Sequence, residues 1–333
     1  MGEICLKQIE IQRYAKSIGI EAIGFCDADF SQTFIERLKE RKRLNCLSGF
    51  EEQDENVRVN VGSLLENAST IISIALPYKT SEPNKAYPYM SKSSMGIDYH
   101  KVIKEKLNLL ADFISKKYGG ESIVLCDTSP LHDREIAYKC GIGFYGKNNN
   151  IINPLYGSFI FLGELVTDIY IERSISMESR CRDCSLCIKA CPSKALEKPF
   201  FLNAQRCLSY VTQKKEQLTP EEISLAGCRV YGCDTCQDVC PYNRKAGECG
   251  IKEFSEPVYD PMNMLYQSNK EFMNTFGMTS SGWRGRKVLT RNLINSMGNS
   301  GDKKYIEVLQ ELREKRPELK YYIDIAIDKL MQK

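Results

Sequence analysis

The stretch CRDCSLCIKACP, from Cys181 to Pro192, determines how the rest of the chain is interpreted. Its four cysteines follow the spacing C-x2-C-x2-C-x3-C-P, which is typical of bacterial ferredoxin segments that bind 4Fe-4S clusters. In two-cluster ferredoxins the fourth cysteine of such a run binds the other cluster. The sequence therefore predicts a second set of cysteine ligands elsewhere in the chain.

That second set is CDTCQDVCP, from Cys233 to Pro241, with Cys207 upstream. Exchanging the last cysteine of each run assigns all eight thiolates to two clusters. The first predicted quartet is Cys181, Cys184, Cys187 and Cys240, and the second is Cys191, Cys207, Cys233 and Cys236. Zinc is the alternative ligand for clustered cysteines, but zinc sites need neither interlocked triplets nor the Cys-Pro ending.

The chain has fifteen cysteines, of which seven lie outside these two quartets. Isolated cysteines are commonly small buried apolar residues, and we expect that role for most of them. They are Cys5, Cys26, Cys46, Cys126, Cys140, Cys228 and Cys249.

Composition and charge place the chain among ordinary globular proteins with two or three domains. It has 333 residues, 42% of them hydrophobic, and a formal net charge of +3. The last 51 residues, from Trp283, carry 12 Lys and Arg against 7 Asp and Glu, whereas the preceding part carries 34 against 36. This basic C-terminal part fits a polyanionic partner, although a solvated helical face also explains it.

The first 170 residues alternate between helical and strand patterns, which predicts a domain with a central sheet. The predicted elements are helices over 4–18 and 102–118 and strands over 21–26, 70–76 and 122–126. We expect a mixed α+β or α/β fold: a domain over 1–170, a ferredoxin-like double-cluster domain over 171–247, and an irregular linker with a short helical, HEAT-like tail over 248–333. In the tail, helical patterns cover 287–297, 303–314 and 318–331.

Two neighbouring clusters can conduct electrons, so we expect a substrate or second cofactor site that receives them. The N-terminal part contains neither G-x-G-x-x-G after a strand nor G-x-x-x-x-G-K-[ST], so nucleotide binding lacks support. Asp127 follows a predicted strand, where an acid can donate a proton to a bound ligand. Strand ends also use aspartate to cap the backbone, so Asp127 has a structural explanation as well.

Several motifs together resemble the epoxyqueuosine reductase (QueG) family over most of the chain. They are Gly96-Ile97-Asp98-Tyr99-His100, Asp127-Thr128-Ser129-Pro130, the stretch from Gly141 to Asn148, Leu162-Gly163-Glu164-Leu165, the stretch from Arg206 to Tyr210, and the stretch from Tyr231 to Gln237. The resemblance implies reduction of epoxyqueuosine to queuosine at the wobble position of tRNA. It also implies a cobalamin cofactor, reduced through the two 4Fe-4S clusters.

The resemblance further implies roles for individual residues. Asp127 corresponds to the proton donor beside the corrin. The implied cobalamin contacts are Arg58, Asp127, Ile151, Leu162, Ser209, Asp234 and Thr235. Taken alone, Arg58 could equally be a surface charge, and the others core or turn residues.

Positive charge near the tail suggests how tRNA is bound, because phosphates attract Lys and Arg. The candidate tRNA contacts are Lys214, Lys215, Arg284, Arg286, Lys287 and Arg291. Trp283 could stack on a base or anchor the core. Many family members continue into a longer run of helical repeats. With the short tail of this chain, the resemblance predicts the redox centre more fully than the tRNA-binding surface.

Two other functions are compatible with the same motifs: a reductive dehalogenase-like cobalamin enzyme, and a non-enzymatic two-cluster electron-transfer protein. The N-terminus lacks an export signal and no apolar run reaches membrane-spanning length, so a cytoplasmic protein without membrane contact is expected. We also expect a monomer that takes electrons from an unidentified cellular donor.

Overall fold

β2 (Thr70–Pro77) and β7 (Ile160–Thr167) are the central strands of a four-stranded sheet in the order β1-β2-β7-β4. The structure is a computed structural model that describes residues 3–79, 87–248, 250–255 and 259–332. All three strand pairs are antiparallel, with β1 (Ala22–Asp27) and β4 (Ser122–Leu125) at the edges. The central strands are apolar along nearly their whole length because helices cover both faces of the sheet.

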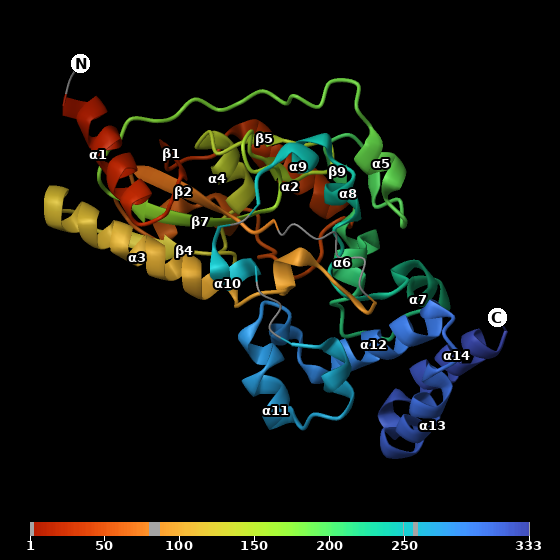
Figure 1. The fold of residues 1–333 in the computed structure, drawn as a ribbon. Helices are drawn as coiled ribbons and strands as arrows, with labels where there is room; N and C mark the ends of the chain where they lie inside the picture. Colours follow the sequence, from red (N-terminus) through yellow and green to blue (C-terminus); the bar gives the residue numbers. More distant parts are fainter. Residues whose placement is uncertain (1–2, 80–86, 249, 256–258, 333) are drawn as a thin grey trace.

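Helices α1 (Glu3–Ser17) and α3 (Tyr99–Tyr118) cover one face, and α4 (Asp133–Lys139) covers the other (Figure 1). α3 begins where the Asp98 carboxylate accepts a hydrogen bond from the His100 N–H. It ends at Gly119, whose φ of 75° is unfavourable for other residues. α2 (Gln32–Arg43) packs through Phe34 against His132, with the ring centroids 5.1 Å apart.

The cysteine-rich segment consists of short elements. β5 (Phe144–Tyr145) and β6 (Ile151–Ile152) form a short antiparallel pair that precedes this segment. The strands within the segment are β8 (Leu196–Lys198), β9 (Phe201–Leu202) and β10 (Arg229–Tyr231). Its helices are α5 (Leu186–Ala190), α6 (Leu208–Val211), α7 (Pro220–Ala226), α8 (Thr235–Asp238) and α9 (Pro241–Lys245). Elements of this length bury little apolar surface each, which fits a segment whose order comes from metal bonds.

The C-terminal part contains the three predicted helices, α12 (Arg286–Ser300), α13 (Tyr305–Lys315) and α14 (Lys320–Met331). α12 and α14 lie close together, since a Cβ at Gly298 would come within 2.6 Å of the Ala326 Cα. The preceding segment, expected to be irregular, also contains α10 (Lys252–Ser255) and α11 (Asn269–Asn274). α11 is fixed by a capping box instead of a long apolar repeat, which explains why periodicity missed it.

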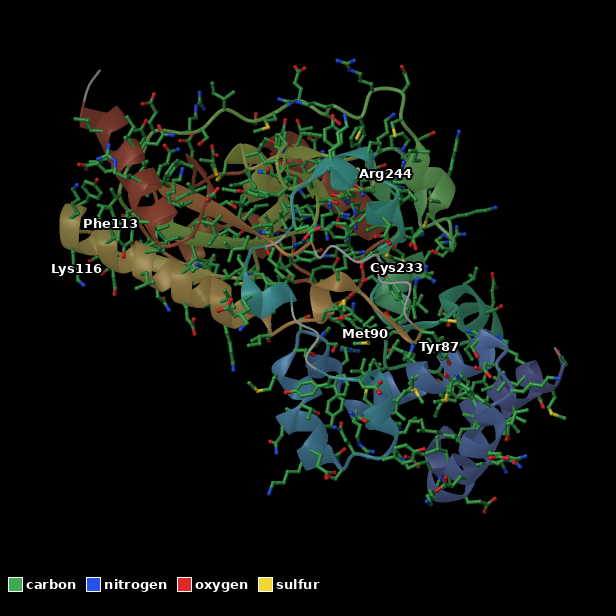
Figure 2. All side chains as sticks on the ribbon, viewed as in Figure 1. Tyr87, Met90, Phe113, Lys116, Cys233 and Arg244 are labelled. Carbon is green, nitrogen blue, oxygen red and sulfur yellow. The ribbon has the colours of Figure 1, made fainter. Side chains whose placement is uncertain are left out.

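The cysteine-rich segment and the C-terminal helices share one hydrophobic core. β3 (Tyr89–Met90) pairs in parallel with β10, although about 140 residues separate them. Met90 is buried in the same core as Leu208, Leu293 and Ile323. Figure 2 shows Tyr87 and Met90 where the upper body meets the C-terminal helices. The predicted boundary near residue 247 therefore does not separate two cores.

An ion pair also joins the N-terminal half to the cysteine-rich segment. Lys92 and Asp234 are 4% and 2% exposed. The Asp234 carboxylate accepts a hydrogen bond from the Lys92 backbone N–H at 2.8 Å and lies 4.0 Å from its Nζ. Burial raises the pKa of Asp234, and Lys92 opposes that shift. The pair thus fixes the segment between Cys233 and Cys236 to the rest of the fold.

None of the helices in the described ranges is long and apolar enough to cross a membrane.

We expect Lys92→Met to lower the free energy of unfolding by about 3 kcal/mol, because a buried carboxylate loses its partner. An acid whose pKa is raised by folding loses stability as pH rises through that pKa, so the deficit should be larger at a pH above the raised pKa of Asp234 than at a pH below it. Thermal unfolding of the cluster-loaded protein measures this. Lys304→Met, which removes an exposed pair with Asp302, is the control and should change little. Equal deficits at both pH values would contradict the prediction.

Candidate functional site

Five of the eight predicted cluster cysteines lie within or directly beside a short helix. Cys187 lies in α5 and Cys191 directly follows it, while Cys207 directly precedes α6. Cys236 lies in α8, and Cys240 precedes the proline that begins α9. The first residue of a helix has no intrahelical partner for its N–H, so proline, which has no N–H, loses no hydrogen bond there. Its fixed φ suits the helix, so the Cys-Pro ending sets the direction of the chain after the last ligand.

The first predicted quartet is brought together in the structure. Burial raises the pKa of Cys187, and the charges of Cys181, Cys240 and Cys184 raise it further. These four thiols line a cavity of about 440 Å³. Four basic side chains also line it: Lys147, Arg180, Arg182 and Lys245.

The second predicted quartet is also brought together. Burial raises the pKa of Cys207 to about 11, with further contributions from Cys233 and Cys191. The pKa of Cys236 lies well above its usual value, first because of burial and then because of Cys207 and Cys233. Cys187 of the first quartet also acts on Cys236, so the two quartets are neighbours.

These thiols fit iron-sulfur clusters. Neighbouring buried thiols ionise only at a large cost in free energy unless a positively charged metal offsets the negative charge of the thiolates. The iron ions of an iron-sulfur cluster supply that positive charge. Within the part of the chain that the structure describes, no three His, Cys, Asp or Glu side chains converge as the ligands of one ion do. In a 4Fe-4S cubane each thiolate binds a different iron, so its four ligands need not converge on one point.

Four of the seven remaining cysteines are buried as expected: Cys26, Cys46, Cys126 and Cys140. Cys228 is half-buried. The side chain of Cys5 and all of Cys249 lie outside the described residues.

Asp127 lies two residues after the end of β4, in a strained loop. Its φ of 53° is left-handed, which is uncommon for a residue other than glycine. Its side chain is 61% exposed. The Tyr99 hydroxyl donates a hydrogen bond to Asp127 Oδ2 at 2.6 Å, and His100 Nε2 lies 3.8 Å from the same oxygen. The carboxyl is therefore exposed on one side and held on the other.

His100 and Tyr99 are further functional candidates, which belong to the Gly96–His100 motif but had no role predicted from the sequence. His100 Nδ1 lies 2.7 Å from Asp98 Oδ1, and this hydrogen bond raises the pKa of His100. Burial and the charge of Asp127 raise the pKa of Tyr99, which stays protonated and able to donate. The signal available was the stretch Asp98-Tyr99-His100, whose neighbouring side chains converge because α3 begins there.

Two further carboxyls lie near Asp127. Burial and then the charge of Asp127 raise the pKa of Asp133 to about 7. Glu164 is fully buried in β7, and burial raises its pKa well above the usual range, with Asp133 and Asp127 adding to the shift. Burial therefore favours the protonated, neutral form of Glu164, which limits the negative charge around Asp127.

The predicted cobalamin contacts come from both halves of the chain. Arg58 lies in the 3-10 helix η1 (Val57–Val59) and is 7% exposed. Ile151 in β6 and Leu162 in β7 belong to the same apolar cluster. Ser209 lies in α6, beside Cys207.

The other two predicted contacts, Asp234 and Thr235, lie between cysteine ligands and already have partners. Lys92 holds the Asp234 carboxylate, and the Arg229 guanidinium donates to the Thr235 hydroxyl at 2.7 Å. These side chains fix the loop between Cys233 and Cys236.

Several buried polar atoms lack a hydrogen-bond partner within the described chain. They include Arg58 Nε, His100 Nε2, Ser129 Oγ and Asn148 Nδ2. Buried polar groups are normally satisfied, so unpaired ones are compatible with a polar ligand. A corrin carries many amide side chains, and the donors and acceptors present suit it.

The predicted tRNA contacts differ in accessibility. Lys215 and Lys287 are exposed, whereas Arg284 and Arg286 are partly exposed. Lys214 pairs with Glu222. These side chains flank α6 and the start of α12.

Arg291 is the exception and requires a correction. It is 4% exposed, and its guanidinium donates to the backbone carbonyls of Lys214 and Glu216 at 3.0 and 3.1 Å. The side chain therefore holds the 214–216 loop against α12 and does not face a ligand. Composition reveals that a cation is present but not that it is buried.

Comparison with known proteins agrees with this geometry. The family model described as "4Fe-4S double cluster binding domain" matches residues 180–243, and the model described as "Epoxyqueuosine reductase QueG, DUF1730" matches residues 58–128. An epoxyqueuosine reductase from Bacillus subtilis is 40% identical over 323 residues, which cover 92% of this chain and 83% of the relative.

Solved structures are similar over almost the whole chain. The epoxyqueuosine reductase of Streptococcus thermophilus has a TM-score of 0.91 at 36% identity, covering 98% of this chain and 90% of that one. An epoxyqueuosine reductase with an epoxyqueuosine-modified tRNA-Tyr stem loop has a TM-score of 0.85 at 36% identity, covering 99% of this chain and 100% of that one. On this identity and coverage, the chain belongs to the epoxyqueuosine reductase family.

Proposed function

We propose that the protein reduces epoxyqueuosine to queuosine at the wobble position of tRNA. The observation that carries this is 40% identity to an epoxyqueuosine reductase across 83% of that enzyme's length. The convergence of eight cysteines in two adjacent quartets supports it, because reduction requires a supply of electrons. Family membership favours this function over a reductive dehalogenase or a simple electron carrier.

The reaction converts an epoxide to an alkene. It consumes two electrons and two protons, breaks both carbon–oxygen bonds of the ring, and releases the oxygen as water. The clusters provide the route for electrons, and an acidic group of the protein must supply protons to the departing oxygen.

Cobalamin is the cofactor we propose between the sheet domain and the cysteine-rich segment. When bound, it supplies the strongly reducing centre that acts on the substrate. Arg58, with its unpaired buried Nε, and Ser209 would hold its polar periphery. Ile151 and Leu162 would provide apolar contacts.

Asp127 is the proposed proton donor. Its exposed oxygen faces solvent or a ligand, while the Tyr99 hydroxyl fixes the other oxygen at 2.6 Å. His100, whose pKa is raised by Asp98, lies 3.8 Å away and can restore the proton after turnover. This arrangement supports a proton path from His100 to Asp127, with the Asp98 carboxylate orienting the His100 ring.

The electron donor is proposed to dock at the first quartet. The thiols of this quartet line a cavity together with Lys147, Arg180, Arg182 and Lys245. Such a basic rim favours an acidic redox partner. Electrons would pass to the second quartet and then towards the substrate.

The tRNA is proposed to bind along the basic side chains near α6 and α12, namely Lys214, Lys215, Arg284, Arg286 and Lys287. Since tRNA is the substrate, we place the protein in the cytoplasm. We propose that one chain is sufficient for activity, because both quartets and Asp127 belong to the same chain.

Asp127→Asn should reduce turnover of epoxyqueuosine-bearing tRNA roughly 100- to 10,000-fold, the usual range for loss of a general acid. Quantifying queuosine by nucleoside mass spectrometry, with reconstituted clusters and cobalamin, measures the effect. Asp27→Asn removes another exposed strand-end carboxylate and should retain activity. Full activity in Asp127→Asn would exclude it as the donor.

Single ligand substitutions should remove one cluster each. Cys187→Ser and Cys207→Ser are each expected to lower iron content from about eight to about four atoms per chain. Cys46→Ser, at a buried cysteine outside both quartets, should keep full iron content. Iron and sulfide analysis with electron paramagnetic resonance of the reduced protein tests this; unchanged iron in either ligand variant would refute the assignment.

A further inference from the structure

An exposed cluster of three aromatic rings and one arginine lies beside the candidate site. We name Phe50, Tyr210, Trp283 and Arg284 the aromatic platform. Phe50 and Trp283 are 45% and 57% exposed, and their ring centroids lie 5.4 Å apart. The Tyr210 ring lies 5.2 Å from that of Phe50. Three segments far apart in the sequence thus place flat rings together at the surface.

The platform is rigid despite its exposure. Trp283 lies in the 3-10 helix η7 (Gly282–Arg284), and its indole N–H donates to the Tyr231 hydroxyl at 3.1 Å. Tyr231 is 7% exposed, and its hydroxyl lies 3.3 Å from the Ser280 carbonyl oxygen. Side chains already ordered lose little entropy when they bind a ligand.

Arg284 adds a cation to the rings. Its guanidinium lies 4.3 Å from the Trp283 ring centroid and 5.0 Å from that of Phe50. Among the described residues, no carboxylate forms an ion pair with it, and its buried Nε has no hydrogen-bond partner. The charge of Glu216 acts on Arg284, but the two side chains form no direct ion pair. The stacked guanidinium is therefore suited to an anion next to a flat group.

The platform is connected to the catalytic segment. Tyr210 directly follows Ser209 in α6. The Ser280 hydroxyl donates to the Ser93 carbonyl at 2.7 Å, and the Asp98 N–H donates to the Met278 carbonyl at 2.9 Å. The segment leading to Trp283 is therefore hydrogen-bonded to the residues that begin α3, where Tyr99 and His100 contact Asp127.

We propose that the aromatic platform stacks an unpaired nucleobase of the tRNA loop, next to the modified nucleotide, while Arg284 binds the adjoining phosphate. This inference rests on the proposed function. Every base has a flat π face, so aromatic rings bind unpaired bases with little dependence on sequence. A paired stem offers no such face, which makes the loop the partner that matches these side chains.

The first test is equilibrium binding of a fluorescently labelled anticodon stem loop to the holoprotein, measured by anisotropy. Trp283→Ala and Phe50→Ala should each weaken Kd roughly 5- to 150-fold. Trp283→Phe keeps a ring and should lose less than Trp283→Leu. Tyr170→Ala, at another half-exposed aromatic residue, is the matched control and should bind normally.

Salt dependence separates stacking from charge. Trp283→Ala should leave the slope of log Kd against log salt unchanged, because no phosphate contact is lost. Lys215→Ala should reduce that slope by about one if it contacts phosphate. Thermal unfolding and iron content confirm that each variant is folded and loaded.

The second test pairs protein variants with abasic RNA. Single loop nucleotides are replaced by abasic sites, and Kd is measured with wild type and Trp283→Ala. At one position the abasic RNA should bind wild type weakly but show no further loss with Trp283→Ala, because both changes remove the same contact.

The inference is overturned if wild type binds and converts the stem loop while Trp283→Ala and Phe50→Ala keep wild-type Kd. It is also overturned if, at every loop position, the loss of affinity caused by the abasic site adds fully to the loss caused by Trp283→Ala. Slower turnover with a protein electron donor but not with a chemical reductant, at unchanged Kd, would assign the platform to the donor instead. Absence of conversion by wild type would contradict the proposed function itself.

Discussion

Crowding of eight thiol groups is the constraint on which the rest of the structure depends. Burial and mutual repulsion raise the pKa of Cys207 and of Cys236, so their thiolates are unfavourable until iron supplies positive charge. The surrounding chain has strands of two or three residues and helices of four to seven, too short to hold this arrangement alone. Metal binding and local folding are therefore coupled here, as in other small metal-bound segments.

The proposed proton donor, Asp127, is positioned differently: the packed sheet and its helices hold it in place without a bound cofactor. The four-stranded sheet fixes the end of β4, and Asp127 extends from it with a left-handed φ of 53°. Asp98 orients His100, and Tyr99 holds one Asp127 oxygen. Electrons thus come from a part of the fold that metal bonds order, and protons come from a part that side-chain packing orders.

The sequence was most informative where the determinants are local. Cysteine spacing predicted two quartets whose thiols the structure brings together, and long apolar runs predicted β2, α3 and the C-terminal helices. It was least informative where partners are distant: β3 and β10 are too short for a periodic pattern, and burial of Arg291 arises only when α12 packs under the 214–216 loop. His100 gave no signal by itself, because its pairing with Asp98 depends on the first turn of α3.

The parallel pairing of β3 with β10 has a consequence for how such proteins diversify. A bacterial ferredoxin can be joined to other genes as one continuous piece of coding sequence. Here a strand from residues 89–90 completes the structure around the cysteines, and Lys92 neutralises the carboxylate between two of them. Recombination that exchanged residues 171–247 alone would separate both contacts. The redox part and the sheet domain are therefore structurally interdependent, and an exchange would have to include both.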